Sequence, residues 1–170
     1  MNVISLDIFP HPAWQAQIPD QVPATLQPQL CDTGSLTARL KATGRAFSLQ
    51  LLTEVANPLP QALAKRWQQT DGIFRAVNLL LDNTAVIYAQ TWIPASSWQA
   101  LTPLAALKQQ PLGEFMFAQP DLTRSAMQFI TWSTPRLPGQ TVEPIFGRRS
   151  FFCLQQHELL VQELFLHGDF

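Results

Sequence analysis

The sequence predicts an α+β domain, in which helices pack on a mainly antiparallel sheet, from three observations. Helical and strand-like segments are interspersed without the regular strand-helix-strand spacing that parallel sheets need. The pair Asp82-Asn83 between two apolar runs is typical of a two-residue hairpin turn. The last two strand-like segments are also close enough for only a hairpin. With 170 residues and 46% hydrophobic content, the chain is expected to form a single domain over residues 1–170.

Six segments of apolar, β-branched and aromatic residues are predicted to be strands. They are Phe47–Thr53, Ile73–Leu81, Ala85–Ile93, Met127–Ser133, Ser150–Leu154 and Leu159–Leu166. Helices are expected at four places. These are residues 35–43, the stretch after Pro60, and two starts at Ser97-Trp98 and Thr102-Pro103. Ser35 is the expected N-cap of the first helix and Gly44 its closing residue. The dense prolines before residue 30 predict extended pieces and turns.

Composition limits the partners and the location. Charged residues make up 14% of the chain and the net charge is −1, whereas soluble domains average roughly 25% charged residues. Nucleic acid is therefore not an expected partner. No apolar run approaches the roughly 20 residues that cross a bilayer, and the first residues lack the pattern of a signal peptide. We expect a cytoplasmic protein without membrane insertion, in which Cys31 and Cys153 are free, buried thiols.

Familiar catalytic motifs fail at a required position. His157-Glu158 begins like a zinc-binding helix, but Val161 stands where the second histidine is needed. The chain has neither a glycine-rich phosphate loop nor a Gly-x-Ser-x-Gly elbow. Cys153 with His157 is better interpreted as a core cysteine beside a turn residue than as a nucleophile and its base. The sequence therefore predicts no metal and no organic cofactor.

Two charged residues stand in phase with apolar ones. Arg75 shares the alternation of Ile73, Val77 and their in-phase neighbours, so it belongs to the face that points at the core. Glu163 falls in line with Val161 and its apolar neighbours in the same way. A buried, unpaired charge is costly, so each residue needs a partner supplied by the protein or by a ligand. One interpretation is a structural ion pair between Arg75 and Glu163; the other is a binding site.

The hairpin predicts neighbours for Arg75. With a two-residue turn at Asp82-Asn83, Gln90 lies opposite Arg75, and Tyr88 and Trp92 flank it on the same face. Arginine, amide, phenol and indole would form a possible cavity wall for a small aromatic anion. The alternative interpretation of these residues is an amphipathic patch at a sheet edge.

Four segments resemble one known family in their order and spacing. They are GSLTARLKATG, IFRAVNLLLDNTAVIYAQTWIPASS, KQQPLGEFMF and GRRSFFCLQQHELLVQELFL. Together they resemble chorismate pyruvate-lyase, the bacterial enzyme that opens ubiquinone biosynthesis. The resemblance covers nearly the whole chain, except for roughly the first 30 residues. It implies an α+β domain with a mostly antiparallel six-stranded sheet, and an internal cavity beneath helical flaps.

The resemblance also implies an activity and site residues. The activity is cofactor-independent conversion of chorismate into 4-hydroxybenzoate and pyruvate. We expect the protein to be a monomer. The family's binding arginine corresponds to Arg75, its buried carboxylate to Glu163, and its two lid positions to Leu36 and Leu112. Arg75 and Glu163 are thus the expected catalytic residues, and all four are expected to bind substrate and product. One departure is Gln90, which stands where some members carry a second arginine.

Two other functions are compatible with the pattern. The first is a non-catalytic module that binds a small aromatic acid, because effector domains of some transcription regulators resemble the same fold. Such regulators normally carry a helix-turn-helix domain, for which a chain of 170 residues has no room. The second is a structural or partner-binding domain held by an Arg75–Glu163 ion pair. The sequence leaves open the roles of Arg148 and Arg149, one of which should face inward and the other outward.

Overall fold

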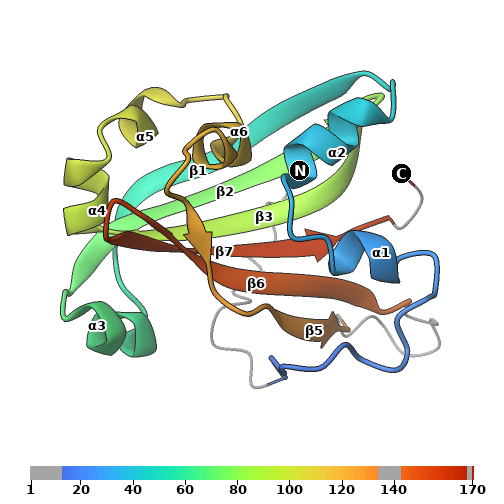
Figure 1. Ribbon diagram of the computed structural model, residues 1–170, viewed down its shortest axis with the longest axis horizontal. Helices are drawn as coiled ribbons and strands as arrows, with labels where there is room; N and C mark the ends of the chain where they lie inside the picture. Colours follow the sequence, from blue (N-terminus) through green and yellow to red (C-terminus); the bar gives the residue numbers. More distant parts are fainter. Residues whose placement is uncertain (1–12, 134–142, 168–169) are drawn as a thin grey trace.

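The computed structural model describes residues 13–133, 143–167 and 170, and one antiparallel sheet runs through them (Figure 1). Its strands follow the order β1-β2-β3-β7-β6-β4, and β5 also pairs with β6. The strands are β1 (Phe47–Pro58), β2 (Asp71–Leu81), β3 (Thr84–Pro94), β4 (Thr123–Arg124), β5 (Gln128–Trp132), β6 (Ile145–Leu154) and β7 (His157–Phe165). The predicted α+β class is confirmed.

Six helices accompany the sheet in the described ranges. They are α1 (Gln27–Leu30), α2 (Leu36–Ala42), α3 (Gln61–Trp67), α4 (Ala95–Ala100), α5 (Pro103–Ala106) and α6 (Leu112–Phe117). In Figure 1, α2 and α6 lie side by side in front of the sheet. Ser35 caps α2 as predicted, because its hydroxyl accepts a hydrogen bond from the Ala38 N–H.

Several predicted elements need correction. The sheet has seven strands instead of six, because the two-residue β4 is too short to leave an alternating pattern. β1 continues past Thr53 to Pro58, and its last four residues are exposed at the edge of the sheet. α1 lies where extended pieces and turns were expected. α4 begins at Ala95 after Pro94, so Ser97 is inside the helix and its hydroxyl donates to the Glu158 carbonyl. Both cysteines are free, but Cys31 is exposed and Cys153 is half-buried, which differs from the expected burial.

The β2–β3 hairpin has the predicted turn and an unpredicted bulge. Asp82 and Asn83 both have positive φ, at 50° and 63°, as a two-residue turn of this kind requires. Leu81 pairs with Thr84, and Leu80 with Ala85. Leu79 then pairs with Ile87, so Val86 is an extra residue in β3. Beyond this bulge, every residue of β3 faces the side opposite to the one that a regular hairpin would give it.

Four rows of side chains cross the helix-covered face of the sheet. The two outer rows are mostly large and apolar. They contain Leu79, Ile87, Phe165 and Phe146 on one side, and Ile73, Ile93, Leu159 and Phe152 on the other. The first packs against helices α1 and α2, and the second against the segment from α4 to α6. The two rows between them differ, because they contain small and charged side chains.

The opposite face of the sheet is covered by a separate apolar core. Phe74 and Trp92 meet there with their ring centroids 4.7 Å apart, and Leu160 and Leu63 join the same cluster.

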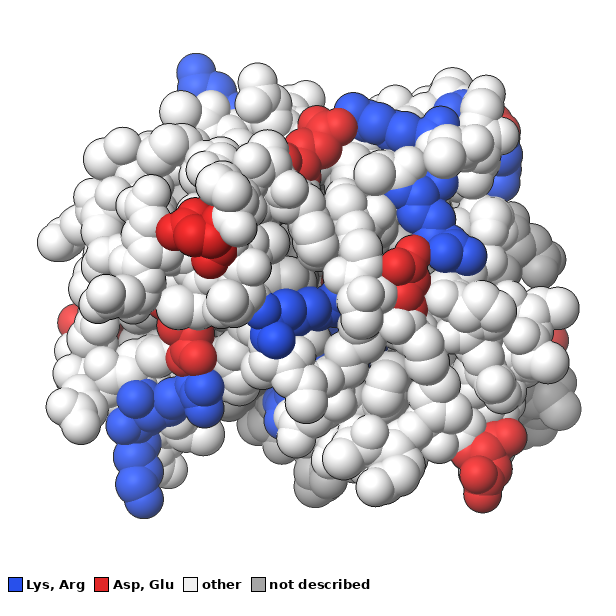
Figure 2. Space-filling model, viewed as in Figure 1, with Lys and Arg blue, Asp and Glu red and all other residues white. Residues whose placement is uncertain are grey.

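On the face of the molecule in Figure 2, Lys and Arg side chains occur in small separate groups, most of them beside acidic residues. They form no continuous basic surface on that face.

Candidate active site

A cavity lies between the sheet and the two helices α2 and α6. Its floor is the pair of inner rows. Small side chains form this floor, flanked by the large residues of the outer rows. They belong to Val77, Ala89, Thr91 and Val161. Because small side chains cannot fill the height between the sheet and the helices, a space remains at the centre of the face. The polar residues around it are Thr37, Arg75, Thr91, Arg124, Arg148 and Glu163.

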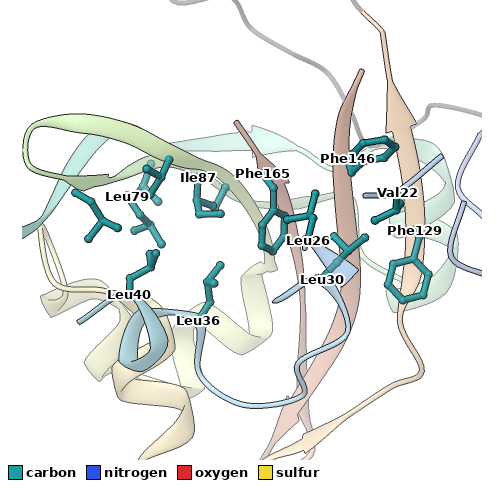
Figure 3. Close-up of a cluster of buried hydrophobic side chains, with 14 residues drawn as sticks. Val22, Leu26, Leu30, Leu36, Leu40, Leu79, Ile87, Phe129, Phe146 and Phe165 are labelled. Carbon is teal, nitrogen blue, oxygen red and sulfur yellow. The ribbon is translucent and has the colours of Figure 1, made fainter. Parts of the chain in front are cut away.

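Helices α2 and α6 form the cover. Figure 3 shows Leu36 at the start of α2 and Leu40 farther along it, both close to the buried cluster on the sheet. Leu112 begins α6, and it lines the same cavity as Leu36. The helices approach closely at Gly113, where an added Cβ would lie 3.3 Å from the Thr37 hydroxyl oxygen.

An exposed ion pair between Lys41 and Glu114 also joins the two helices. With both side chains more than two fifths exposed, this pair contributes little stability and is screened by salt. Helices α2 and α6 are therefore held in place mainly by the packing of their apolar side chains.

Arg75 is 3% exposed and is held from three sides. Nη1 donates to the Glu54 carboxylate, and Nη2 donates to the carbonyls of Lys108 and Gln110, at 2.8 and 3.2 Å. A guanidinium has five N–H donors, and in the described residues the remaining two have no protein partner. These bonds orient the arginine before any ligand arrives, while leaving donors for an anion in the cavity.

Glu163 is paired with Arg148 on the neighbouring strand. The Nε of Arg148 donates to Oε2 of Glu163 at 2.6 Å, and its Nη1 donates to the carbonyls of Gln29, Leu30 and Asp32. The Arg148 side chain is 1% exposed and that of Glu163 is 15% exposed. Oε1 of Glu163 accepts no hydrogen bond from the residues that the structure describes. It is the acceptor that the protein leaves available at this wall of the cavity.

Arg124 forms the third cationic group. Its Nε donates to the Ser150 hydroxyl at 2.9 Å, and its Cζ lies 4.9 Å from the centre of the Phe152 ring. Its Nη1 makes longer contacts, of 3.4 and 3.3 Å, with the carbonyls of Asp32 and Thr33. Burial lowers the pKa of Arg124 to about 10, and repulsion by Arg148 adds to that effect.

Four of the predicted residues line this one cavity: Leu36, Arg75, Leu112 and Glu163. The predicted burial of Arg75 and Glu163 in phase with apolar neighbours is confirmed for Arg75, and Glu163 is largely covered. The interpretation of these two as a structural ion pair is wrong. Arg75 is paired with Glu54, and Glu163 with Arg148.

The predicted wall of Gln90, Tyr88 and Trp92 is also wrong. Thr91, not Gln90, lies opposite Arg75. The extra residue Val86 shifts the pairing by one and turns all three predicted residues to the other face. There the side-chain amide of Gln90 donates to the Tyr88 hydroxyl, and Trp92 packs in the apolar core. Ala89 and Thr91 take their places in the cavity.

Sequence patterns did not reveal Glu54, Arg124 or the inward position of Arg148 as parts of the site. Glu54 follows the end of the predicted first strand, and Arg124 lies in a strand of two residues. A signal for Arg148 existed, because adjacent strand residues point to opposite faces. Arg149 is the outward member of the pair; it donates to Gln128 and lies over the Trp14 ring. Burial lowers its pKa to about 10.

Neither a metal site nor a membrane span is found in the part of the chain that the structure describes. No group of three or more His, Cys, Asp or Glu side chains there is placed to hold a metal ion. No helix in the same ranges combines the length and apolar character needed to span a bilayer.

The fold and the site define a class: an α+β domain that encloses an arginine-lined cavity between one sheet face and two short helices. Solved structures share this fold. The effector domain of PhnF from Mycobacterium smegmatis aligns with a TM-score of 0.54 at 16% identity, over 79% of this chain and 89% of that one. The ligand-binding domain of a putative GntR-family transcriptional regulator from Bordetella bronchiseptica aligns with a TM-score of 0.51 at 13% identity, over 71% and 84%. At such identities, the likeness concerns the fold alone.

Sequence comparisons identify the family. The family model described as chorismate lyase matches residues 11–169. A probable chorismate pyruvate-lyase from Pseudoalteromonas translucida is 35% identical over 170 residues, which cover 92% of this chain and 93% of that protein. Another from Thiobacillus denitrificans is 35% identical over 158 residues, covering 86% and 84%. The chain belongs to the chorismate lyase family.

Proposed function

We propose that this chain is a cytoplasmic lyase that converts chorismate into 4-hydroxybenzoate and pyruvate, the step that opens ubiquinone biosynthesis. One observation carries the proposal. Two groups of opposite charge, the buried Arg75 and the largely covered Glu163, line the same cavity, and each keeps unused hydrogen-bonding capacity. They suit the two ends of a 4-hydroxybenzoate ring, which has a carboxylate at one end and a hydroxyl at the other. The family membership of the chain supports the same reaction.

Each wall of the cavity has a role in this proposal. Arg75 binds the ring carboxylate through its positive charge and a remaining N–H donor. Oε1 of Glu163 accepts from the ring hydroxyl, while Arg148 keeps that carboxylate in place. Leu36 and Leu112 cover the ring from α2 and α6 and exclude water.

The reaction itself needs little from the protein. The bond between ring C3 and the ether oxygen breaks, C4 loses its hydrogen, and the ring becomes aromatic. The enolpyruvyl group leaves with that oxygen and becomes pyruvate when its methylene carbon gains a hydrogen. Aromatisation supplies the driving force, so holding a reactive conformer in a polar-edged, covered cavity is the main catalytic task. We therefore propose a reaction without metal or organic cofactor.

The state of the protein belongs to the same proposal. We propose that it acts as a monomer, because one chain supplies every group that the proposed reaction uses. We also propose that it binds neither nucleic acid nor membrane, since its net charge is −1 and a nucleic-acid binder usually presents a basic face.

The direct test is to mix the purified chain with chorismate, after dialysis against a chelator, and to measure 4-hydroxybenzoate and pyruvate. Equal amounts of both products are expected. Glu163→Gln should lower turnover more than affinity if the carboxylate acts in the transition state. Glu158→Gln is the matched control, because it makes the same change on the same strand, where the side chain pairs with Arg66 outside the cavity.

Two results would contradict the proposal. Activity that is lost on dialysis and restored by a divalent ion would show that a metal takes part. Tight binding of 4-hydroxybenzoate without turnover of chorismate would instead favour a non-catalytic binding module, like the effector domains that share the fold.

A further inference from the structure

We infer that Arg124 binds the second carboxylate of the substrate, the one on the enolpyruvyl side chain, and thereby distinguishes substrate from product. This inference rests on the proposed function, because only a substrate with two carboxylates uses both ends of the cavity. Arg124 lines the cavity together with Arg75, Arg148 and Glu163.

The position of Arg124 is set by one inner row of the sheet. Arg75, Thr91, Val161 and Ser150 are successive partners across β2, β3, β7 and β6. Three strand spacings separate the two ends of this row, which corresponds to about 14 Å between backbones. Arg75 rises from one end, and Arg124 is bonded to the Ser150 hydroxyl at the other. Two long cationic side chains therefore face the cavity from opposite ends.

Arg124 makes no direct ion pair with a carboxylate among the residues that the structure describes, and Glu163 and Asp32 act on its charge only at longer range. Its hydrogen-bond acceptors are one hydroxyl and two carbonyls, and both carbonyl contacts are 3.3 Å or longer. Its Nη2 makes no hydrogen bond in the same part of the structure. By contrast, Arg75 and Arg148 each have a glutamate partner. Burial and the nearby Arg148 also disfavour the charged form of Arg124, as its lowered pKa shows. An anion bound beside it would offset that cost.

The chemistry of the substrate selects this arginine. In chorismate, the ether that leaves is attached next to the ring hydroxyl. With the ring carboxylate at Arg75 and the hydroxyl at Glu163, an enolpyruvyl group that extends away from Arg75 places its carboxylate toward β6 and β4. Arg148 is there, but it is already paired with Glu163. Gln90 points to the other face of the sheet. Arg124 remains.

The experiment compares a ligand with two carboxylates and a ligand with one. Arg124→Gln and Arg124→Lys are assayed for the KM of chorismate and, by calorimetry, for the Kd of 4-hydroxybenzoate. Arg66→Gln is the control, since it also removes one arginine, from an ion pair that does not line the cavity. Because one charge-assisted hydrogen bond is lost, we expect Arg124→Gln to raise the KM of chorismate about tenfold or more. Its Kd for 4-hydroxybenzoate should stay within about twofold of the wild type, because the product lacks the second carboxylate.

The possible outcomes separate the inference from the proposed function. Equal weakening of both ligands by Arg124→Gln would assign Arg124 a structural role, through its contacts with the carbonyls of Asp32 and Thr33, and would overturn the inference. No change in either ligand would overturn it as well. A smaller rise in KM for Arg124→Lys than for Arg124→Gln would support it. A wild-type chain that does not convert chorismate would instead refute the proposed function itself.

Discussion

Arg148 and Glu163 lie opposite each other on β6 and β7, and the Nε of Arg148 donates to Oε2 of Glu163 at 2.6 Å. The same guanidinium donates to three carbonyls between Gln29 and Asp32, just before the covering helix α2. A single buried arginine thus fixes the candidate catalytic carboxylate and the segment that leads into the cover. Stability and site geometry are coupled at this residue.

Arg148→Met should therefore lower the free energy of unfolding by about 3–5 kcal/mol, because it leaves a largely buried carboxylate without its cation. The double variant Arg148→Met/Glu163→Leu should recover part of that loss, since both charges are then absent. Urea denaturation of the wild type, both single variants and the double variant measures the coupling. A loss no larger than that of Arg66→Gln, which removes a more exposed ion pair, would contradict the assignment.

Arg75→Lys should weaken the binding of 4-hydroxybenzoate about tenfold or more, although the charge is kept. An ammonium group cannot hold the Glu54 carboxylate, the carbonyls of Lys108 and Gln110 and a ligand in the geometry of a planar guanidinium. Calorimetry gives the affinity, and Arg45→Lys, at an exposed ion pair, is the control. Unchanged affinity in Arg75→Lys would mean that a point charge is sufficient.

Gly113→Ala tests the contact between the covering helices. The new Cβ would lie 3.3 Å from the Thr37 hydroxyl oxygen, so α2 and α6 must separate slightly. We expect 4-hydroxybenzoate to dissociate about two- to fivefold faster, which corresponds to a cost below about 1 kcal/mol. Stopped-flow measurement gives the rate. Adding Thr37→Ala removes that oxygen and should restore the slower rate; failure to do so would place the effect elsewhere.

The lowered pKa of Glu158 predicts that the stability of the fold depends on pH. Hydrogen bonds from Arg66, together with one from Trp67, hold the pKa of its carboxyl below the ordinary value of 4.5. A carboxyl with a lower pKa in the folded state stabilises the fold above about pH 4.5, and that contribution is lost as the pH falls through the lowered value. The difference in Tm between the wild type and Glu158→Gln should thus be largest near neutral pH and shrink below about pH 4.5. A constant difference from pH 7 to pH 3 would contradict this account.

Much of the fold could be predicted because its signals are local. The capped start of α2 at Ser35, the turn at Asp82-Asn83 and the in-phase charge at Arg75 each depend on a few neighbouring residues. The partners of those charges could not be predicted, because they depend on how distant strands meet. Glu54 reaches Arg75 across a strand pair with its own irregularity between Leu51 and Thr53.

Short secondary-structure elements were the second feature that could not be predicted from the sequence. Arg124 owes its position to a strand of two residues, which pairs with β6 at Phe152 and Cys153. Two residues carry no periodicity, so no pattern marks them as part of a sheet. The family resemblance supplied Leu36 and Leu112, whose approach across the cavity depends on the packing of α2 against α6.

The bulge at Val86 implies that chain length, as well as residue identity, specifies which side chains line the cavity. Deleting Val86 would remove only the unpaired residue of β3, so Ile87 would stay opposite Leu79 and Thr91 opposite Arg75. Ala89 and Thr91 would keep their places in the cavity, whereas a deletion beyond the bulge, at Tyr88, would bring the bulky Trp92 opposite Arg75. Deleting a paired residue of β3 should therefore be more damaging to binding than deleting Val86.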